Sequence, residues 1–233
     1  MQYANITKAS FVSRQNRFVA TVNLNGTETQ VHVKNTGRCR ELLTPGATVY
    51  LVDSQNEKRK YRYDLVSVEK GDLLVNMDSQ APNQVFGDFL RSGGFLEGVT
   101  LVKPEYRYGS SRMDFYFERN GERHLAEIKG VTLEENGICR FPDAPTERGV
   151  RHLGELAQAV REGFQAWACF VVQMDGMRWL EPNEKTDPAF ARALREAAAA
   201  GVGVRAFCCQ VYPDSMEIVS ELPVHLNVQE DSL

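Results

Sequence analysis

The dipeptide Asn120-Gly121 separates two strand-like runs and constrains the fold of this chain more than any other feature. Asn-Gly between alternating apolar and polar residues is the strongest short-range signal of a two-residue β-hairpin turn. The turn sets the register of its strands, and a slip of one residue would move every side chain to the other face of the sheet. With Arg119 facing Glu122, the register pairs Glu118 with Arg123, Tyr116 with Leu125, Asp114 with Glu127 and Arg112 with Lys129.

Asp114 and Glu127 are thereby expected on one face, with β-carbons roughly 5 Å apart. Like charges directly opposite each other destabilise a sheet, so two carboxylates there need a reason. Mg²⁺ or Mn²⁺ supplies one, because such a cation takes oxygen ligands from carboxylates, polarises a phosphoryl oxygen and lowers the pKa of water. Lys129, one step along that face, would orient the water or offset charge on a phosphate. The alternative is a solvated face on which Arg112 and Lys129 neutralise the acids.

The first 80 residues read as β structure. Strand-like runs occupy residues 18–24, 27–33, 47–52, 61–68 and 73–77. Turn signals at Asn25-Gly26 and Pro45-Gly46 separate some of them. Five short strands in this length suggest a small closed barrel, and an OB-like barrel is one option. Pro82 then breaks the pattern, so we expect one domain over residues 1–81 and a second over 82–233.

The second domain alternates helices and strands. Helices are predicted at residues 83–91, 145–162 and 188–200, and strands at 101–107, 111–118, 122–131, 164–173 and 202–212. This order is typical of an α/β domain with a mixed sheet. The hairpin faces that carry Met113, Phe115 and Phe117 on one strand, and Ala126 and Ile128 on the other, are expected to pack on a helix.

Composition narrows the class of protein. Hydrophobic residues make up 42% and charged residues 25% of the 233, which excludes disordered and fibrous classes. The N-terminus lacks the apolar core of a signal peptide, and the most apolar run, residues 166–172, is too short to span a bilayer. We therefore expect a cytoplasmic protein with neither a membrane partner nor an obligate protein partner. Five cysteines without a CxxC pattern favour reduced thiols over a zinc site or disulfides.

A polar segment links the Glu127 strand to the next predicted helix. Asp143 or Thr146 can cap that helix, and a helix N-terminus is a natural phosphate-binding place. Arg148 and His152 follow at helical spacing, together with Glu155, on a face away from the apolar positions. They could line a catalytic cleft and contact the scissile strand. The alternative is helix capping beside an exposed charged face.

Basic residues are concentrated in the first third of the chain. Residues 1–80 hold 11 Lys and Arg against 8 Asp and Glu, whereas the remainder holds 16 against 23. Cationic side chains bind phosphates, and aromatic and amide groups stack on or hydrogen-bond to bases. The residues predicted to bind nucleic acid are Arg14, Asn16, Arg17, Phe18, His32, Asn35, Arg38 and Arg40. Ordinary solvated charges are the alternative.

Several motifs together match one family. They are Arg-Gln-Asn-Arg-Phe at 14–18, Asn-Thr-Gly-Arg at 35–38, Glu-Leu-Leu-Thr-Pro-Gly at 41–46, Ser-Arg-Met-Asp-Phe at 111–115, Glu-Ile-Lys-Gly-Val-Thr-Leu at 127–133, and Phe-Pro-Asp-Ala-Pro-Thr-Glu-Arg-Gly at 141–149 followed by His-Leu at 152–153. Over nearly its whole length the chain resembles the sugar fermentation stimulation protein A family. That resemblance implies an N-terminal OB-like barrel and a C-terminal domain of the PD-(D/E)xK nuclease type.

The resemblance also implies a site. Asp114 matches the acid of the nuclease pattern, and Glu127 and Lys129 match its Glu-x-Lys. Asp114, Glu127 and the Ile128 carbonyl would hold Mg²⁺ or Mn²⁺, with Glu105 as a possible outer ligand. We therefore expect a metal-dependent nuclease acting on DNA or RNA. A non-catalytic DNA-binding regulator of sugar genes is the alternative, and a sugar-metabolic enzyme is a weaker third reading.

Overall fold

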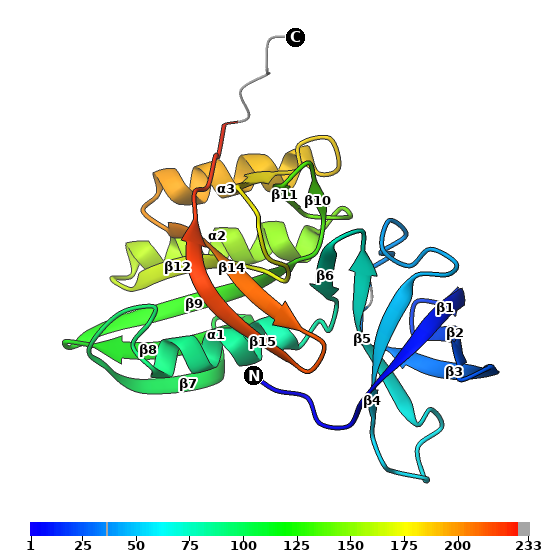
Figure 1. Cartoon of the computed structure of the whole chain (residues 1–233). Coiled ribbons are helices and arrows are strands. Elements are labelled where there is room, and N and C mark those ends of the chain that lie inside the picture. The colour runs from blue at the N-terminus through cyan, green and yellow to red at the C-terminus, as the bar shows by residue number, and fades with distance from the viewer. Residues whose placement is uncertain (36, 228–233) are drawn as a thin grey trace.

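The computed structural model describes residues 1–35 and 37–227, and Figure 1 shows a β-barrel beside a sheet covered by helices. The barrel strands are β1 (Ile6–Asn16), β2 (Val19–Leu24), β3 (Thr27–Val33), β4 (Thr48–Asp53) and β5 (Tyr63–Lys70). They run in the order β3-β2-β1-β4-β5, and pairing of β3 with β5 closes the ring. Closure removes the exposed strand edges that invite aggregation. The expectation of a small OB-like barrel is confirmed.

The five strands of the ring differ from the five expected. β1 was not predicted, and the run at 73–77 forms β6 (Leu73–Asn76), which extends from β5 outside the ring. β1 mixes Ser, Thr, Arg and Gln with its apolar residues, and its register with β2 shifts at two places. Such bulges interrupt the alternation by which a strand is recognised in a sequence.

The second unit is built on a six-stranded mixed sheet. Its strands, in spatial order, are β15 (Ser215–Leu222), β14 (Gly203–Tyr212), β12 (Gln165–Val172), β9 (Glu122–Val131), β8 (Ser111–Arg119) and β7 (Val99–Tyr108). The two central pairings, β14 with β12 and β12 with β9, are parallel, and the outer pairings are antiparallel. The predicted α/β class with a mixed sheet is confirmed, although β15 was missed.

Helices cover both faces of this sheet, as Figure 1 shows. α1 (Ala81–Arg91) packs on one face, and α2 (Glu147–Arg161) and α3 (Pro188–Ala199) lie on the other. A separate three-stranded sheet of β10 (Glu134–Glu135), β11 (Ile138–Phe141) and β13 (Trp179–Pro182) was not predicted. Its strands span only two to four residues each, too short for a periodic signal.

The core on the α2 face continues into the barrel. One cluster of buried side chains includes Leu153 and Phe170 from this unit together with Val22 and Leu65 from the barrel. Gln173, directly after β12, joins the two parts by hydrogen bonds as well. Its Nε2 donates to Asn76 Oδ1 at 3.0 Å and to the Asp78 carbonyl at 3.1 Å. These contacts place the barrel against the end of β12, and the expected boundary at residue 81 stays a prediction.

The hairpin register is confirmed up to a definite point. Arg119 pairs with Glu122, and the ladder continues without a shift to Phe115 opposite Ala126. The pairings expected beyond it, of Asp114 with Glu127 and of Arg112 with Lys129, do not continue this ladder. The two strands therefore separate where the candidate carboxylates begin.

One expectation about the hairpin faces is wrong. Phe115, Phe117, Ala126 and Ile128 pack in the cluster on the α1 face, as expected, but Met113 belongs to the cluster on the α2 face. The cause lies at Asp114, which has no ladder partner in β7 or in β9. The β7–β8 register is unshifted across this position, but Glu105, opposite Asp114, has a left-handed φ of +51°, so both strands are irregular where the side chains change faces.

Two other expectations concern the whole chain. All five cysteines are free and buried, in agreement with reduced thiols. In the part of the chain that the structure describes, no helix has the length and apolar character needed to cross a membrane.

Candidate active site

Asp114 lies at the fork where β8 and β9 separate. Its Oδ2 accepts a hydrogen bond from the backbone N–H of Ile128 at 2.7 Å. Its Oδ1 accepts from the side chain of Asn83, in α1, at 2.8 Å. The carboxylate thus satisfies a backbone donor that the diverging strand no longer serves, since buried backbone N–H groups are almost always paired. The fork, and not the ladder, positions this acid.

Glu127 is buried on the next strand, with 4% of its surface exposed. Its Oε1 accepts hydrogen bonds from Lys129 Nζ at 2.7 Å and from Nδ1 of His152 in α2. Its Oε2 is buried and has no hydrogen-bond partner among the described residues. A buried carboxylate oxygen without a donor is costly and calls for a ligand.

The pKa values of the two acids are shifted in opposite directions. Burial and the negative charge of Glu127 raise the pKa of Asp114 to about 6, against the weaker opposing effects of its hydrogen bonds and of Lys129. Burial also acts to raise the pKa of Glu127, but His152 and Lys129 outweigh it and hold that pKa below its usual value. Glu127 is therefore the ionised partner, and its charge penalises ionisation of Asp114.

This arrangement fits a divalent cation. Positive charge would relieve the repulsion between the carboxylates and would occupy the unpartnered Oε2 of Glu127. Among the described residues, no three His, Cys, Asp or Glu side chains form a ready metal cluster. The two carboxylates supply oxygen donors. They suit Mg²⁺ or Mn²⁺, which use one or two carboxylates and keep several waters, better than zinc.

The N-terminus of α2 lies next to this site. Thr146 is its N-cap, and its hydroxyl accepts from the Gly149 N–H at 3.0 Å. Asp187 accepts from the Thr146 N–H at 2.8 Å and also caps α3 through the Phe190 N–H at 3.0 Å. Of the two predicted capping residues, Thr146 therefore has that role and Asp143 does not. The cap fixes the start of the helix that carries His152.

Thr146→Ala is expected to lower the free energy of unfolding by about 1 kcal/mol, because the Gly149 N–H loses its acceptor. Thr146→Ser keeps a hydroxyl at the cap and should cost only a few tenths of that. Urea denaturation of both variants checks this prediction, and equal stabilities of the two would contradict it.

The barrel contributes a loop beside this helix end. Gly37 lies against Asp143: a Cβ on Gly37 would stand 2.8 Å from Asp143 Oδ2 and 2.9 Å from Asn35 Oδ1. Arg14 organises the loop by donating from its terminal nitrogens to four backbone carbonyls at 2.6–2.8 Å, those of Arg17, Asn35, Gly37 and Arg38. Both terminal nitrogens of Arg14 are thus hydrogen-bonded within the protein, which favours a structural role for Arg14.

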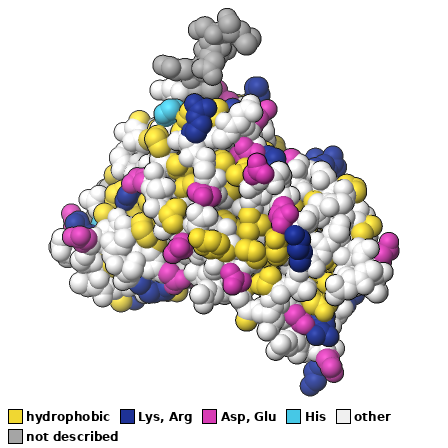
Figure 2. Space-filling view, viewed as in Figure 1, with side chains coloured by type: hydrophobic (Ala, Val, Ile, Leu, Met, Phe, Trp, Pro, Cys, Tyr) yellow, Lys and Arg dark blue, Asp and Glu magenta, His cyan; other side chains and the backbone are white. Residues whose placement is uncertain are grey.

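The other residues predicted to bind nucleic acid fall into two groups. Arg17, Arg38 and Arg40 are exposed on or beside the loop, and Phe18 is 48% exposed. The remaining polar side chains serve the barrel itself. Asn16 accepts from the Phe18 N–H at 2.8 Å, Asn35 donates to the Met77 carbonyl at 2.8 Å, and His32 contacts Asp64 at 2.9 Å. On the face seen in Figure 2, acidic and basic side chains are interspersed, so its charge does not indicate an anionic ligand.

Of two further predicted support residues, Glu105 lies opposite Asp114 in the β7–β8 register and Arg112 lies away from Lys129. Arg112 and Glu105 form an exposed ion pair at 3.0 Å, and Arg112 does not reach Lys129. Glu105, on β7, has a φ of +51°, in the left-handed region that is uncommon for a non-glycine residue. It stands opposite Asp114 of β8, with which it forms no ladder pair. Divergence of the strands explains why the register did not bring Arg112 to the site.

Asn83 is the contact residue that the sequence reasoning missed. The sequence predicts only that a helix starts at Asn83, whereas the Asn83 side chain donates to Asp114 from α1. The two residues are 31 positions apart, and no local pattern links them. A cleft of about 600 Å³ lies beside this pair and is lined by Asn83, Asp114 and Glu105 among others.

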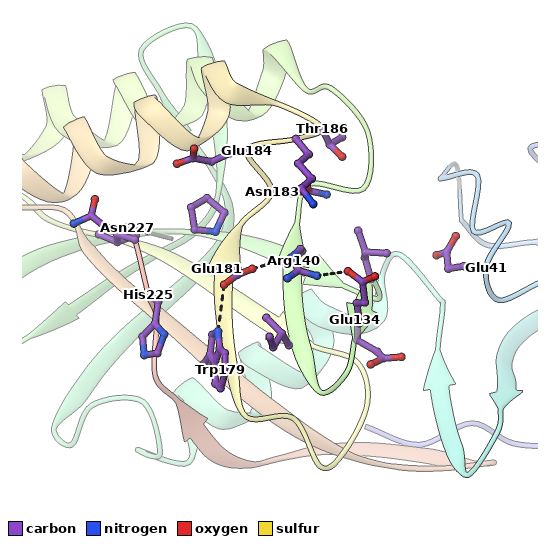
Figure 3. A pocket seen from close by; sticks show the side chains of 16 residues that line it. Glu41, Glu134, Arg140, Trp179, Glu181, Asn183, Glu184, Thr186, His225 and Asn227 are labelled. Carbon is purple, nitrogen blue, oxygen red and sulfur yellow. Dashed lines mark hydrogen bonds and ion pairs between the residues drawn. The ribbon is translucent and has the colours of Figure 1, made fainter. Parts of the chain in front are cut away.

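A larger cavity, of about 1650 Å³, is lined in part by the three-stranded sheet and is shown in Figure 3. Arg140 at its centre donates to Glu181 at 2.7 Å and to Glu135 at 2.6 Å, and Trp179 donates to Glu181 at 3.3 Å. These side chains satisfy one another. None of Asp114, Glu127 and Lys129 lines the cavity. Asp114 lines the smaller cleft, whereas Glu127 and Lys129 line neither of the two.

Comparison with known proteins agrees with this fold. The family model described as the SfsA N-terminal OB domain matches residues 12–77, and that of the sugar fermentation stimulation protein RE domain matches residues 80–215. A sugar fermentation stimulation protein homolog of Desulfitobacterium hafniense (strain Y51) is 51% identical over 217 residues, covering 93% of this chain and 95% of the relative. A homolog of Clostridium beijerinckii is 49% identical over 218 residues, covering 94% and 96%.

Among solved structures, that of Pyrococcus furiosus SfsA in complex with Ca²⁺ superposes with a TM-score of 0.87 at 29% identity, covering 97% of this chain and 98% of that one. The barrel, the mixed sheet and the matched models confirm the resemblance seen in the motifs. This chain belongs to the sugar fermentation stimulation protein (SfsA) family.

Proposed function

We propose that this protein is a nuclease that hydrolyses phosphodiester bonds in DNA or RNA with the help of Mg²⁺ or Mn²⁺. The observation that carries the proposal is the pair of acids at a fork between strands: Glu127 is buried, Asp114 is half-buried, and the charge of Glu127 raises the pKa of Asp114. Glu127 keeps one buried oxygen free there, and Lys129 lies beside its other oxygen. The negative charge of Glu127 disfavours ionisation of Asp114, and a cation between them would offset that repulsion.

Asp114 and Glu127 would hold the cation, with the carbonyl of Ile128 as a further ligand. When bound, the cation supplies Lewis-acid stabilisation of the phosphoryl oxygens and a more acidic water. Lys129 offsets negative charge that develops on the phosphate, from a position set by its hydrogen bond to Glu127. Asn83 and the Ile128 N–H keep the Asp114 carboxylate pointed into the fork.

The solved structure of one relative supports the proposal that the site binds a divalent cation. The SfsA of Pyrococcus furiosus, similar to this chain over 97% of its length, was solved in complex with Ca²⁺. Ca²⁺ takes the same class of oxygen ligand as Mg²⁺ but with looser geometry, so it is a common occupant of sites that use either ion. The family name describes sugar fermentation and specifies no chemistry.

The barrel would grip the substrate. Three arginines, Arg17, Arg38 and Arg40, are exposed near the loop that contacts Asp143. Asp143 lies three residues before Thr146, the N-cap of α2. Arg148, in the first turn of α2, lies next to His152 at the carboxylate site. Exposed basic side chains are thus present both on the barrel loop that contacts Asp143 and in the first turn of the helix that follows Asp143. Such side chains suit a phosphate backbone.

The test is incubation of the purified chain with DNA and RNA in Mg²⁺ or Mn²⁺, with chelator controls. The proposal expects cleavage that requires the cation. Tight binding that is independent of metal, without any cleavage, would instead support a non-catalytic DNA-binding regulator.

Arg38→Ala is expected to weaken nucleic-acid binding and to reduce the slope of log K against log salt concentration by about 1, as for loss of one phosphate contact. Within the described residues, its side chain makes no hydrogen bond or ion pair, so folding should not change. Fluorescence anisotropy over a range of salt concentrations measures the slope. Arg192→Ala, an exposed substitution on α3, serves as the control, and an equal effect of the two would count against nucleic-acid binding by the barrel.

A further inference from the structure

We infer that His152 is a positioning residue that holds one oxygen of Glu127 and so presents the other oxygen to the cation. This inference rests on the proposed function and deepens it. His152 lies in α2, is only 2% exposed, and contacts Glu127 across 25 positions of the chain.

The hydrogen bonds of His152 define which ring nitrogen carries the proton. Nε2 lies 3.4 Å from Nε of Arg148, and Nδ1 contacts Oε1 of Glu127. A guanidinium only donates, so Nε2 must accept, and the proton of a neutral ring then resides on Nδ1. The Nδ1–H therefore donates to the carboxylate of Glu127. The ionised carboxylate of Glu127, which only accepts, requires the same proton on Nδ1, and the 3.4 Å contact with Arg148 agrees with it.

The distribution of donors on Glu127 is unequal. Oε1 receives two of them, from Lys129 Nζ at 2.7 Å and from His152, whereas Oε2 is buried without any. Two donors on one oxygen fix the rotation of the carboxylate. The second oxygen is then kept free, at a cost that a protein tolerates when the oxygen has a ligand to bind.

A purely structural reading of His152 fits less well. The other buried residues of α2 are apolar or glycine, namely Gly149, Leu153, Leu156, Ala157 and Ala159. A leucine at position 152 would fill such a face without burying a polar ring. Hydrogen bonds to metal-binding carboxylates orient them, and loss of such partners typically costs about 10- to 100-fold in metal affinity.

Three substitutions separate positioning from packing. In His152→Asn the side-chain amide occupies the place of Nδ1 and still donates to Glu127. In His152→Gln the amide reaches the place of Nε2 and faces Arg148 instead. His152→Leu removes both groups. Isothermal titration with Mn²⁺ alone is expected to show affinity reduced about 10- to 100-fold in the Leu and Gln variants and largely kept in the Asn variant.

A direct measurement on the parent protein complements this comparison. Nitrogen-15 NMR of the imidazole should show a protonated Nδ1 and an unprotonated Nε2, and the opposite tautomer would overturn the inference. Equal Mn²⁺ affinity of the Asn and Gln variants would overturn it as well. If His152→Leu fails to fold, the Asn and Gln pair still decides. A parent chain that binds no Mn²⁺ would overturn the proposed function. If the parent and all three variants bind Mn²⁺ equally, the proposed function stands and only the role of His152 is overturned.

Discussion

Glu127→Gln is expected to abolish cation-dependent cleavage, with a loss of about 1000-fold or more in rate. The substitution keeps the size of the side chain but removes the charge that attracts the cation. Loss of several kcal/mol of charge stabilisation in the transition state corresponds to a rate factor of that size. If the new NH₂ group stands at the place of Oε1, it cannot accept the hydrogen bonds of Lys129 and His152, and if it stands at the place of Oε2, it cannot bind a cation.

The measurement is single-turnover cleavage of labelled DNA and RNA in Mn²⁺, alongside Mn²⁺ titration. Glu122→Gln is the matched control, because Glu122 lies on the same strand at the hairpin end, with its side chain 52% exposed. That control should cleave like the parent. Cleavage that survives both Asp114→Ala and Glu127→Ala would remove these residues from the site.

Asp114→Asn is expected to stabilise the metal-free protein at neutral pH while it abolishes cleavage. The pKa of Asp114 is raised from 3.8 to about 6 by burial and by the charge of Glu127. A raised pKa means that the folded state holds the proton more tightly than the unfolded state. The resulting stabilisation is present below pH 3.8 and is lost as the pH rises through about 6. Above that pH, the ionised carboxylate penalises folding by about 3 kcal/mol.

Asparagine removes this penalty and keeps the shape. Its carbonyl oxygen can accept from the Ile128 N–H, and its NH₂ can donate to Asn83 once that amide turns over. Urea denaturation with chelator should show the variant to be more stable at pH 7, with the difference vanishing near pH 4. Saturating Ca²⁺ should stabilise the parent and not the variant. A variant that is less stable than the parent at pH 7 would show that Asp114 is not strained in the metal-free fold.

The hairpin shows how far sequence reasoning reaches. Asn120-Gly121 determines the turn. The register from Arg119 to Phe115 follows, because a slip of one residue would move every side chain of the strand to the other face of the sheet. Beyond Phe115, the position of Asp114 depends on a backbone N–H of another strand and on an amide of α1. Neither contact leaves a periodic signal, so the strand divergence and the change of face at Met113 could not be anticipated.

In the barrel, too, the individual strands were predictable from the sequence and their assembly into a ring was not. Runs of alternating residues and glycine turns predicted β2, β3, β4 and β5 to within two or three residues at each end. β1 was hidden by its bulges, and the closure of β3 on β5 joins segments about 30 residues apart. Ring closure depends on the curvature and twist of all its strands together, which no single segment encodes.

By itself, the sequence determined the secondary structure of most segments, the hairpin turn and the identity of the residues that could carry metal chemistry. Local rules suffice for these, because each depends on a few neighbouring residues. Only the tertiary structure decided that one oxygen of Glu127 is held by His152 while the other is left free, and that the barrel loop at Gly37 abuts Asp143. Such contacts form between elements far apart in the chain, where packing of whole layers sets the distances.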